Sequence, residues 1–260
     1  MNRIEARLNE LQSKKEKAFI TYMTAGLPDM EGMKQIICAQ EEAGTDIIEL
    51  GIPFSDPVAD GPVIQSASKR AIEQGVNLSV TLQAVKELRQ NCQIPIVFMM
   101  YYNTILFYGV EKFVDKCIEC GVDGVIVPDL PYEEQDEIKA FLGKENAPIL
   151  IQLVSPVSEQ RIPMLLKDAR GFVYCVSSMG VTGQAANFHK DVAKYLQNVK
   201  AHTDIPIMMG FGIRTPEDVQ GYKDIVDGAI VGSHFIRVME ENQYDMEKIK
   251  EYVRSFKAGF

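Results

Sequence analysis

A glutamate in the middle of an apolar run is the first candidate for chemistry. Glu49 lies in the run 47–50, whose other residues are isoleucine and leucine, as in a buried strand. A carboxylate in such surroundings costs free energy unless it is paired or protonated. A structural ion pair is the alternative, but the ends of the other apolar runs carry no lysine or arginine. The sequence therefore favours a functional role for Glu49 over a structural one.

The loop after this run, residues 52–62, adds two further carboxylates. Asp56 and Asp60 lie among three prolines, so the loop should be stiff and acidic. An aspartate before proline or glycine often caps a turn, which is the alternative explanation for both. No lysine ends a strand and the chain has 3 histidines, so Schiff-base and metal-dependent aldolase chemistry lack their residues. Carboxylates remain as the groups that could react.

Two glycine turns are candidates for binding an anion. Gly210-Phe211-Gly212 follows the apolar run 207–209, and Gly232-Ser233 follows the run 229–231. Backbone amides in such turns, together with a short helix that begins at Ser233, suit a phosphate group. Simple tight turns are the alternative. Because glycine turns follow two consecutive apolar runs, the sequence favours a phosphate site over simple turns.

These residues must be positioned by a regular alternation of short apolar runs and amphipathic segments. The runs are apolar in the manner of parallel strands that are covered on both faces. We expect strands at 19–23, 47–50, 96–100, 125–127, 149–153, 172–176, 207–209 and 229–231. We expect helices at 30–43, 79–89, 110–119, 133–142, 159–167, 191–201, 216–222 and 245–256, after a charged amphipathic segment at the N-terminus.

Eight such units predict an α/β fold, a (β/α)8 TIM barrel that forms a single domain over residues 1–260 with an extra N-terminal helix. A weak repeat supports the barrel, since prolines open three strands and Asp46, Asp123 and Asp227 precede three others. An open doubly wound sheet is the alternative, but its nucleotide-binding glycine pattern is missing after the first strand. In a barrel, Glu49 and both glycine turns would meet at the face where active sites form.

The composition narrows the classes of function. With a net charge of −9 and no basic cluster, the chain lacks the surface of nucleic-acid-binding proteins. It shows no long apolar segment or leader, so we expect a cytoplasmic protein that does not enter a membrane. The 5 cysteines fit reduced thiols rather than disulfides. Cys117 and Cys120 form a C-x-x-C, but two ligands cannot complete a zinc site, so helix packing is the favoured interpretation.

Five segments closely resemble signatures of the tryptophan synthase alpha subunit family. They are Glu49–Pro62, Met100–Asn103, Pro128–Pro131, Gly180–Gly183 and Gly210–Ile213, and the likeness spans the whole chain. The resemblance implies a carbon–carbon lyase that cleaves indole-3-glycerol phosphate by a retro-aldol reaction into indole and glyceraldehyde 3-phosphate. It also implies that indole passes to a beta subunit carrying pyridoxal phosphate, in an alpha2-beta2 heterotetramer. No cofactor or metal is expected in this chain.

The resemblance assigns roles to individual residues. The family's catalytic carboxylates fall on Glu49 and Asp60. Its substrate-binding positions fall on Tyr22, Met99, Ile126, Tyr174, Thr182, Gly183, Phe211, Gly212, Gly232 and Ser233. The surface expected to meet the beta subunit includes Pro53, Asp56, Asn103, Phe107, Asp129 and Pro131.

The chain departs from the family pattern at three positions. Ser178 replaces an arginine, Met179 replaces a smaller residue, and Pro128 replaces an alanine. The first two changes bear on how the glycine-containing loop 177–187 would close as a lid, and the third on the stiffness of the surface for the beta subunit. Two other classes stay open on the residues alone: a barrel that acts on another phosphosugar, and an inert barrel kept as a binding subunit.

Overall fold

The computed structural model of the chain describes residues 1–176, 185–210 and 212–260, with the side chains of 185–190 left aside. Nine parallel strands occur in these ranges, in the order β5-β4-β3-β2-β1-β9-β8-β7-β6. Their bounds are β1 Ala18–Thr24, β2 Ile47–Gly51, β3 Ile96–Met99, β4 Gly124–Ile126, β5 Ile149–Leu150, β6 Gln152–Val154, β7 Val173–Val176, β8 Ile207–Gly210 and β9 Gly228–Val231.

One extended segment closes this sheet into a barrel. The expected fifth strand is interrupted at Ile151, and its two parts are β5 and β6. The first part pairs with β4 and the second with β7, so the two ends of the strand order meet in consecutive residues. The predicted barrel and its eight strand segments are confirmed.

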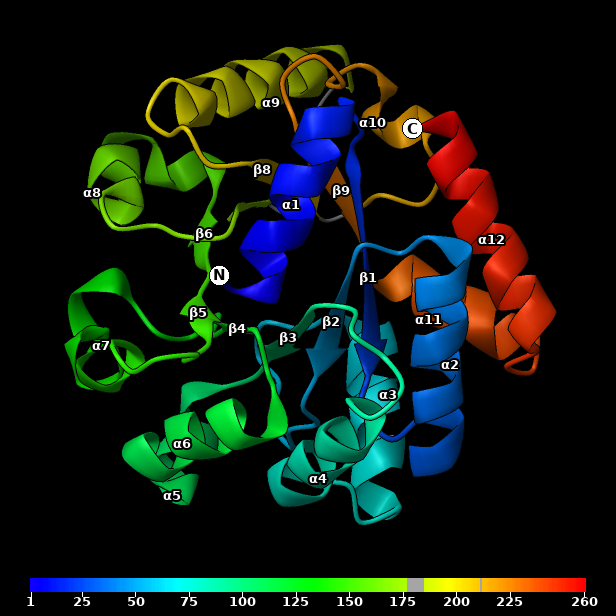
Figure 1. Cartoon of the computed structure of the whole chain (residues 1–260). Helices are drawn as coiled ribbons and strands as arrows, with labels where there is room; N and C mark the ends of the chain where they lie inside the picture. The colour runs from blue at the N-terminus through cyan, green and yellow to red at the C-terminus, as the bar shows by residue number, and fades with distance from the viewer. Residues whose placement is uncertain (177–184, 211) are drawn as a thin grey trace.

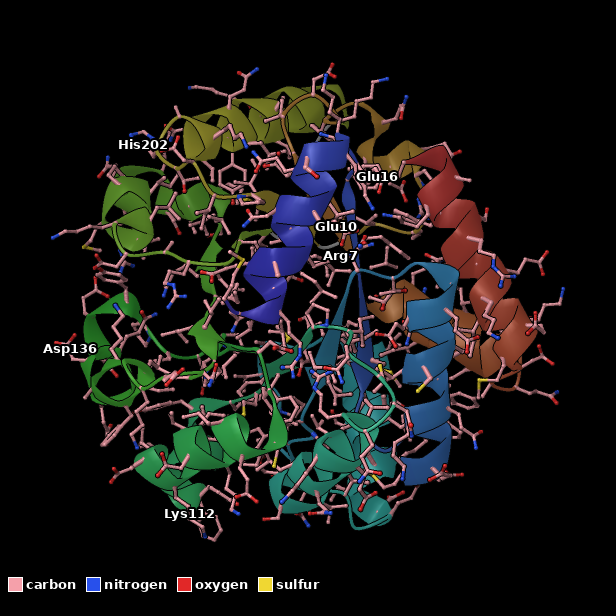
Figure 2. The ribbon with its side chains drawn as sticks, viewed as in Figure 1. Arg7, Glu10, Glu16, Lys112, Asp136 and His202 are labelled. Atoms are coloured by element: carbon pink, nitrogen blue, oxygen red, sulfur yellow. The ribbon has the colours of Figure 1, made fainter. Side chains whose placement is uncertain are left out.

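Helices surround the barrel on all sides in Figure 1. Their bounds are α1 Arg3–Lys14, α2 Met30–Ala43, α3 Pro62–Glu73, α4 Leu78–Leu88, α5 Tyr102–Tyr108, α6 Val110–Cys120, α7 Asp136–Leu142, α8 Ile162–Leu166, α9 Ala185–Lys200, α10 Glu217–Gln220, α11 Ser233–Glu241 and α12 Met246–Gly259. Two short 3-10 turns, η1 Tyr132–Glu134 and η2 Pro156–Arg161, precede α7 and α8. Helices α3 and α5 were not expected, and α11 was expected only at its first residue. Figure 2 shows side chains of the outer helices, such as the exposed Lys112 and Asp136, directed away from the barrel.

The expected N-terminal helix closes one end of the barrel (Figure 1). The side chains of Ile4, Leu8 and Leu11 are buried on one face of α1. They pack in one cluster with interior residues of the strands, including Ala18 and Ile47 at strand starts. The opposite end, where the strands finish, is therefore the end left open for a site.

The repeated aspartates at strand entries have a common role. The carboxylates of Asp46, Asp123 and Asp227 accept hydrogen bonds from backbone N–H groups near the starts of the adjacent strands, at 2.7 Å from Phe19, 2.9 Å from Ile96 and 2.9 Å from Ile207. Each carboxylate thus satisfies a donor at the rim of the barrel. The weak sequence repeat is explained by this contact.

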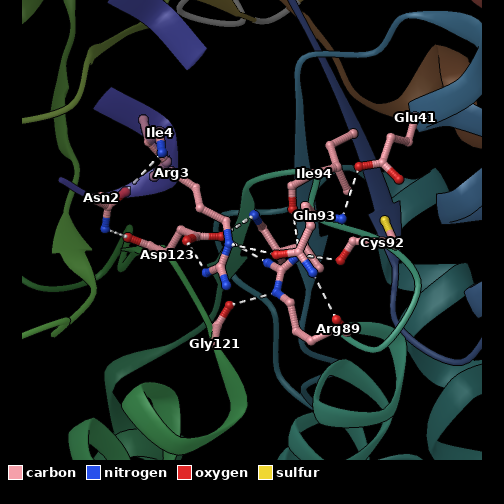
Figure 3. A network of polar contacts seen from close by, with 11 residues as sticks. Asn2, Arg3, Ile4, Glu41, Arg89, Cys92, Gln93, Ile94, Gly121 and Asp123 are labelled. Atoms are coloured by element: carbon pink, nitrogen blue, oxygen red, sulfur yellow. Dashed lines mark hydrogen bonds and ion pairs between the residues drawn. The ribbon is translucent and has the colours of Figure 1, made fainter. Parts of the chain in front are cut away.

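Asp123 also anchors a network of arginines (Figure 3). Its carboxylate accepts from Arg89 Nη2 at 2.8 Å and from Arg3 Nη1 at 2.9 Å. We expect Asp123→Asn to lower the free energy of unfolding by about 2 kcal/mol, because the Arg89 side chain, which is only 9% exposed, loses its counter-charge. Urea unfolding measures this loss. The exposed pairing residue Glu119 is the matched control, since Glu119→Gln should cost less than about 0.5 kcal/mol; equal effects would contradict the role of Asp123.

Candidate active site

A cavity of about 390 Å³ lies at the carboxyl-terminal ends of the strands. Its wall brings together predicted site residues that are far apart in the sequence: Tyr22, Glu49, Asp60, Met99, Tyr174, Gly212, Gly232 and Ser233. Leu153, Val176 and Ile64 add apolar surface to the same wall. Apolar walls with a few convergent polar groups are typical of small-molecule sites.

Glu49 lies in β2, and its side chain is buried at the end of the barrel where the cavity lies. It is paired in register with Tyr22 of β1, and it is 2% exposed. Neither carboxylate oxygen has a hydrogen-bond partner among the described residues. Burial, together with the smaller effect of the nearby charge of Asp60, raises the pKa of Glu49 to about 8. The group is therefore protonated at neutral pH, as an acid catalyst requires.

Asp60 is held at the cavity by Tyr101, which follows β3. The Tyr101 hydroxyl donates a hydrogen bond to Asp60 Oδ2 at 3.1 Å and accepts one from the backbone N–H of Ala59 at 2.9 Å. The Phe54 ring stacks on the Tyr101 ring with centroids 4.9 Å apart. Partial burial raises the pKa of Asp60, and the hydrogen bond from Tyr101 opposes that rise. Sequence reasoning missed the positioning role of Tyr101.

Two buried tyrosines border Glu49. Burial raises the pKa of Tyr22 and of Tyr174, so both phenols stay protonated and act as donors rather than bases. Their rings need glycines beside them. A Cβ at Gly51 would overlap the Tyr22 hydroxyl, and a Cβ at Gly210 would lie 2.6 Å from the Tyr174 ring. The glycines at these strand ends therefore make room for the cavity's aromatic side chains.

The glycine turns also line the cavity. Gly212 has φ +77°, and among the described residues other than its chain neighbours no atom lies within 4 Å of the position of a Cβ, so these residues leave its backbone accessible. Gly232 precedes α11, which begins at Ser233 as predicted. The N-terminus of this nine-residue helix offers unpaired amides and a partial positive charge. Arg237 of the same helix also lines the cavity and was missed from the sequence.

Several predicted substrate-binding residues lie elsewhere or outside the described residues. Ile126 is fully buried in the barrel interior and is not among the residues that line the cavity. The other residues of this group, Thr182, Gly183 and Phe211, fall outside the part of the chain that the structure describes, as do Ser178 and Met179 of the expected lid.

The predicted surface for a partner is mostly exposed. Asp56, Asn103, Phe107, Asp129 and Pro131 are all exposed, and the Phe107 side chain reaches 95%. Pro53 is an exception, because it is buried against the barrel and offers little surface.

Helix α5, which was not expected, places some apolar residues of the segment after β3 in the core and others on the surface. Ile105 faces the core and is fully buried, whereas Leu106 and Phe107 point outward. Val58 of the Asp60 loop is 86% exposed and was missed from the sequence. Exposed apolar side chains next to a cavity indicate an interaction surface.

The described residues offer no site for metal or cysteine chemistry. No group of three or more His, Cys, Asp or Glu side chains there could hold a metal ion. Cys117 and Cys120 are buried on α6, and burial raises the pKa of both thiols, so neither is a reactive thiolate. Among the helices described, none is long and apolar enough to cross a membrane.

Comparison with known sequences gives one consistent family. The chain matches the family profile described as "Tryptophan synthase alpha chain" over residues 8–260. A protein of that description from Lachnospira eligens is 61% identical over 259 residues, which cover 99% of this chain and 98% of the other. A second, from Alkaliphilus metalliredigens, is 44% identical over 257 residues, with 97% and 96% covered.

Comparison with solved structures agrees with the family found from sequence. The tryptophan synthase subunit alpha of Legionella pneumophila superimposes with a TM-score of 0.89 at 33% identity, covering 100% of this chain and 98% of that chain. A ligand-free structure of tryptophan synthase from M. tuberculosis gives a TM-score of 0.87 at 31% identity, covering 100% and 99%.

Proposed function

Because this chain belongs to the family of tryptophan synthase alpha chains, we propose that Glu49 and Asp60 carry out the cleavage of indole-3-glycerol phosphate to indole and glyceraldehyde 3-phosphate. The observation that carries this assignment is the pairing of two carboxylates in one cavity. Glu49 is buried and protonated at neutral pH, whereas Asp60 is partly exposed and accepts a hydrogen bond from a phenol. Their surroundings separate the two groups into an acid and an anion.

The cleavage needs two proton transfers that one carboxyl group can serve in turn. Protonated Glu49 donates its proton to C3 of the indole ring, which leaves positive charge on the ring and its N–H. The anion of Asp60 stabilises that charge. The Glu49 carboxylate then accepts the proton of the side-chain hydroxyl as the carbon–carbon bond breaks. Indole and the aldehyde are released, and Glu49 is protonated again.

The cavity orients the substrate between two unlike ends. The accessible backbone at Gly212, Gly232 and Ser233 is suited to the phosphate. Apolar side chains such as Met99 and Leu153 are suited to the indole ring. With the phosphate fixed at one end, the ring is brought to the carboxylates in a defined orientation.

We propose that a beta subunit docks beside this cavity, as in an alpha2-beta2 heterotetramer. The family's pyridoxal phosphate belongs to that subunit, and no residue of this chain is assigned to a cofactor. The exposed Val58 and Phe107 give the docking surface its apolar character, and Asp56 gives it charge. The loop that carries Val58 also carries Asp60, and Tyr101 ties it to β3. Docking would therefore hold Asp60 in place.

Five free cysteines support action in a reducing compartment such as the cytoplasm.

An assay of indole-3-glycerol phosphate cleavage, with and without a beta subunit, tests this function. We expect slow cleavage by the isolated chain and a rise of at least about tenfold on adding the partner, because docking favours one loop arrangement. Phe107→Ser should reduce that rise while leaving the isolated chain's activity unchanged. Val80→Ser, at an apolar residue of α4 that is 39% exposed, is the control and should preserve the rise. Absence of cleavage in every condition would favour an inert subunit, and cleavage of a different phosphosugar would favour the other barrel class.

A further inference from the structure

Arg237 is the one cation among the described residues that line the cavity. The other ionisable acid–base groups of the wall include the carboxylates Glu49 and Asp60. Arg237 lies on α11, four residues after Ser233 and so about one helical turn beyond the helix start. Positive charge therefore lies in the part of the wall that also carries the glycine turns.

Arg237 forms no ion pair with a described carboxylate. Seven of the 9 arginines form ion pairs: Arg3, Arg7, Arg70, Arg89, Arg161, Arg170 and Arg214. Arg237 and Arg254 form no ion pair with any residue that the structure describes. In a chain with a net charge of −9, an arginine left without a partner at a cavity is available to an anion from outside the protein.

The geometry of a helix directs Arg237 toward the phosphate turn. Side chains lean toward the N-terminus of their helix, so a residue in the second turn covers the turn before it. A side chain at position 237 can therefore reach back toward Gly232 and Ser233, which line the same cavity. Its planar guanidinium can donate two parallel hydrogen bonds to a phosphate, whereas the backbone amides supply only partial charge.

We propose that Arg237 binds the phosphate of the substrate and sets the preference of this cavity for phosphorylated ligands. The inference rests on the proposed function, because that function supplies a substrate with a phosphate at this end. The phosphate lies remote from the bond that breaks. Its contact with Arg237 is therefore made in the ground state and the transition state alike, and it acts on binding more than on the chemical step.

The test compares Arg237→Gln and Arg237→Lys with Arg254→Gln, which removes the same charge from the other arginine without an ion pair. Calorimetry with glycerol 3-phosphate should show affinity about tenfold weaker for Arg237→Gln and intermediate for Arg237→Lys, which keeps the charge without the fork. The KM for indole-3-glycerol phosphate should rise about tenfold, with kcat changed by less than about threefold. Affinity for indole, which has no phosphate, should stay unchanged, and Arg254→Gln should match the wild type throughout.

Two results would overturn the role of Arg237: unchanged affinity of Arg237→Gln for glycerol 3-phosphate, or an equal loss for indole, which would indicate general damage to the cavity. The proposed function fails separately. If the wild type does not cleave indole-3-glycerol phosphate but Arg237→Gln still weakens binding of glycerol 3-phosphate, the phosphate contact stands and the reaction is wrong. If the wild type cleaves the substrate and Arg237→Gln binds glycerol 3-phosphate as the wild type does, the reaction stands and the contact is wrong.

Discussion

Glu49→Gln should lower kcat for cleavage of indole-3-glycerol phosphate by about 10³-fold, with the barrel intact. Glutamine keeps the shape of the side chain but cannot donate a proton and take another back, and a positioned acid–base group contributes about 10² to 10⁴ in rate. Steady-state assays at saturating substrate, with the beta subunit present, measure this loss. Glu145→Gln, at an exposed glutamate, is the matched control and should retain full activity. Activity within about tenfold of the wild type would remove Glu49 from the mechanism.

The stability of the same variant shows whether the loss is chemical. Folded Glu49 keeps its proton up to a pKa of about 8, whereas the unfolded chain loses it near 4.5. The contribution of Glu49 to folding therefore becomes less favourable as pH rises from about 4.5 to about 8. Glutamine removes this dependence, so the variant should gain stability relative to the wild type across that window. An inactive variant with this gain is folded, and its defect lies in catalysis.

Asp60→Asn should lower kcat by about 10² to 10³-fold, because the amide cannot offset positive charge that develops on the indole ring. Tyr101→Phe should have a smaller effect of about tenfold, since it removes only the hydrogen bond that holds Asp60. Asp168→Asn makes the same change of charge at an exposed site and should be silent. If Asp60→Asn were as active as Asp168→Asn, the anion would have no part in the reaction. A loss for Tyr101→Phe as large as that for Asp60→Asn would give the phenol a direct role.

The barrel could be predicted from sequence because each strand is a short apolar run bounded by polar or proline residues. The aspartates that precede strands were visible as a repeat, although their contacts with neighbouring strands were not. Helix α5 was missed because its aromatic and β-branched residues have weak helix propensity. Helix α3 was missed although Pro62 at its start is a recognised signal. The break at Ile151 depends on pairing with two different neighbours, which no local pattern records.

In the candidate site, too, some residues could be predicted from the sequence and others could not. Glu49 could be found because an acidic residue conflicts with an otherwise apolar strand, and Gly212 because a glycine turn follows a strand. Tyr101 was missed because its bond to Asp60 joins residues 41 positions apart. Arg237 was missed because an arginine on a surface helix is ordinary, and only the fold places it in a cavity wall.

The protonation state of Glu49 in the folded protein decides whether this carboxyl can act as the acid of the reaction. Carbon-13 NMR of protein labelled at glutamate side-chain carboxyls should show one signal that is missing in Glu49→Gln. We expect this signal to titrate near pH 8, since the carboxyl is buried without a hydrogen-bond partner among the described residues and lies near Asp60. Titration near pH 4.5, the ordinary value for a glutamate, would contradict it, because Glu49 would then hold no proton to donate at neutral pH.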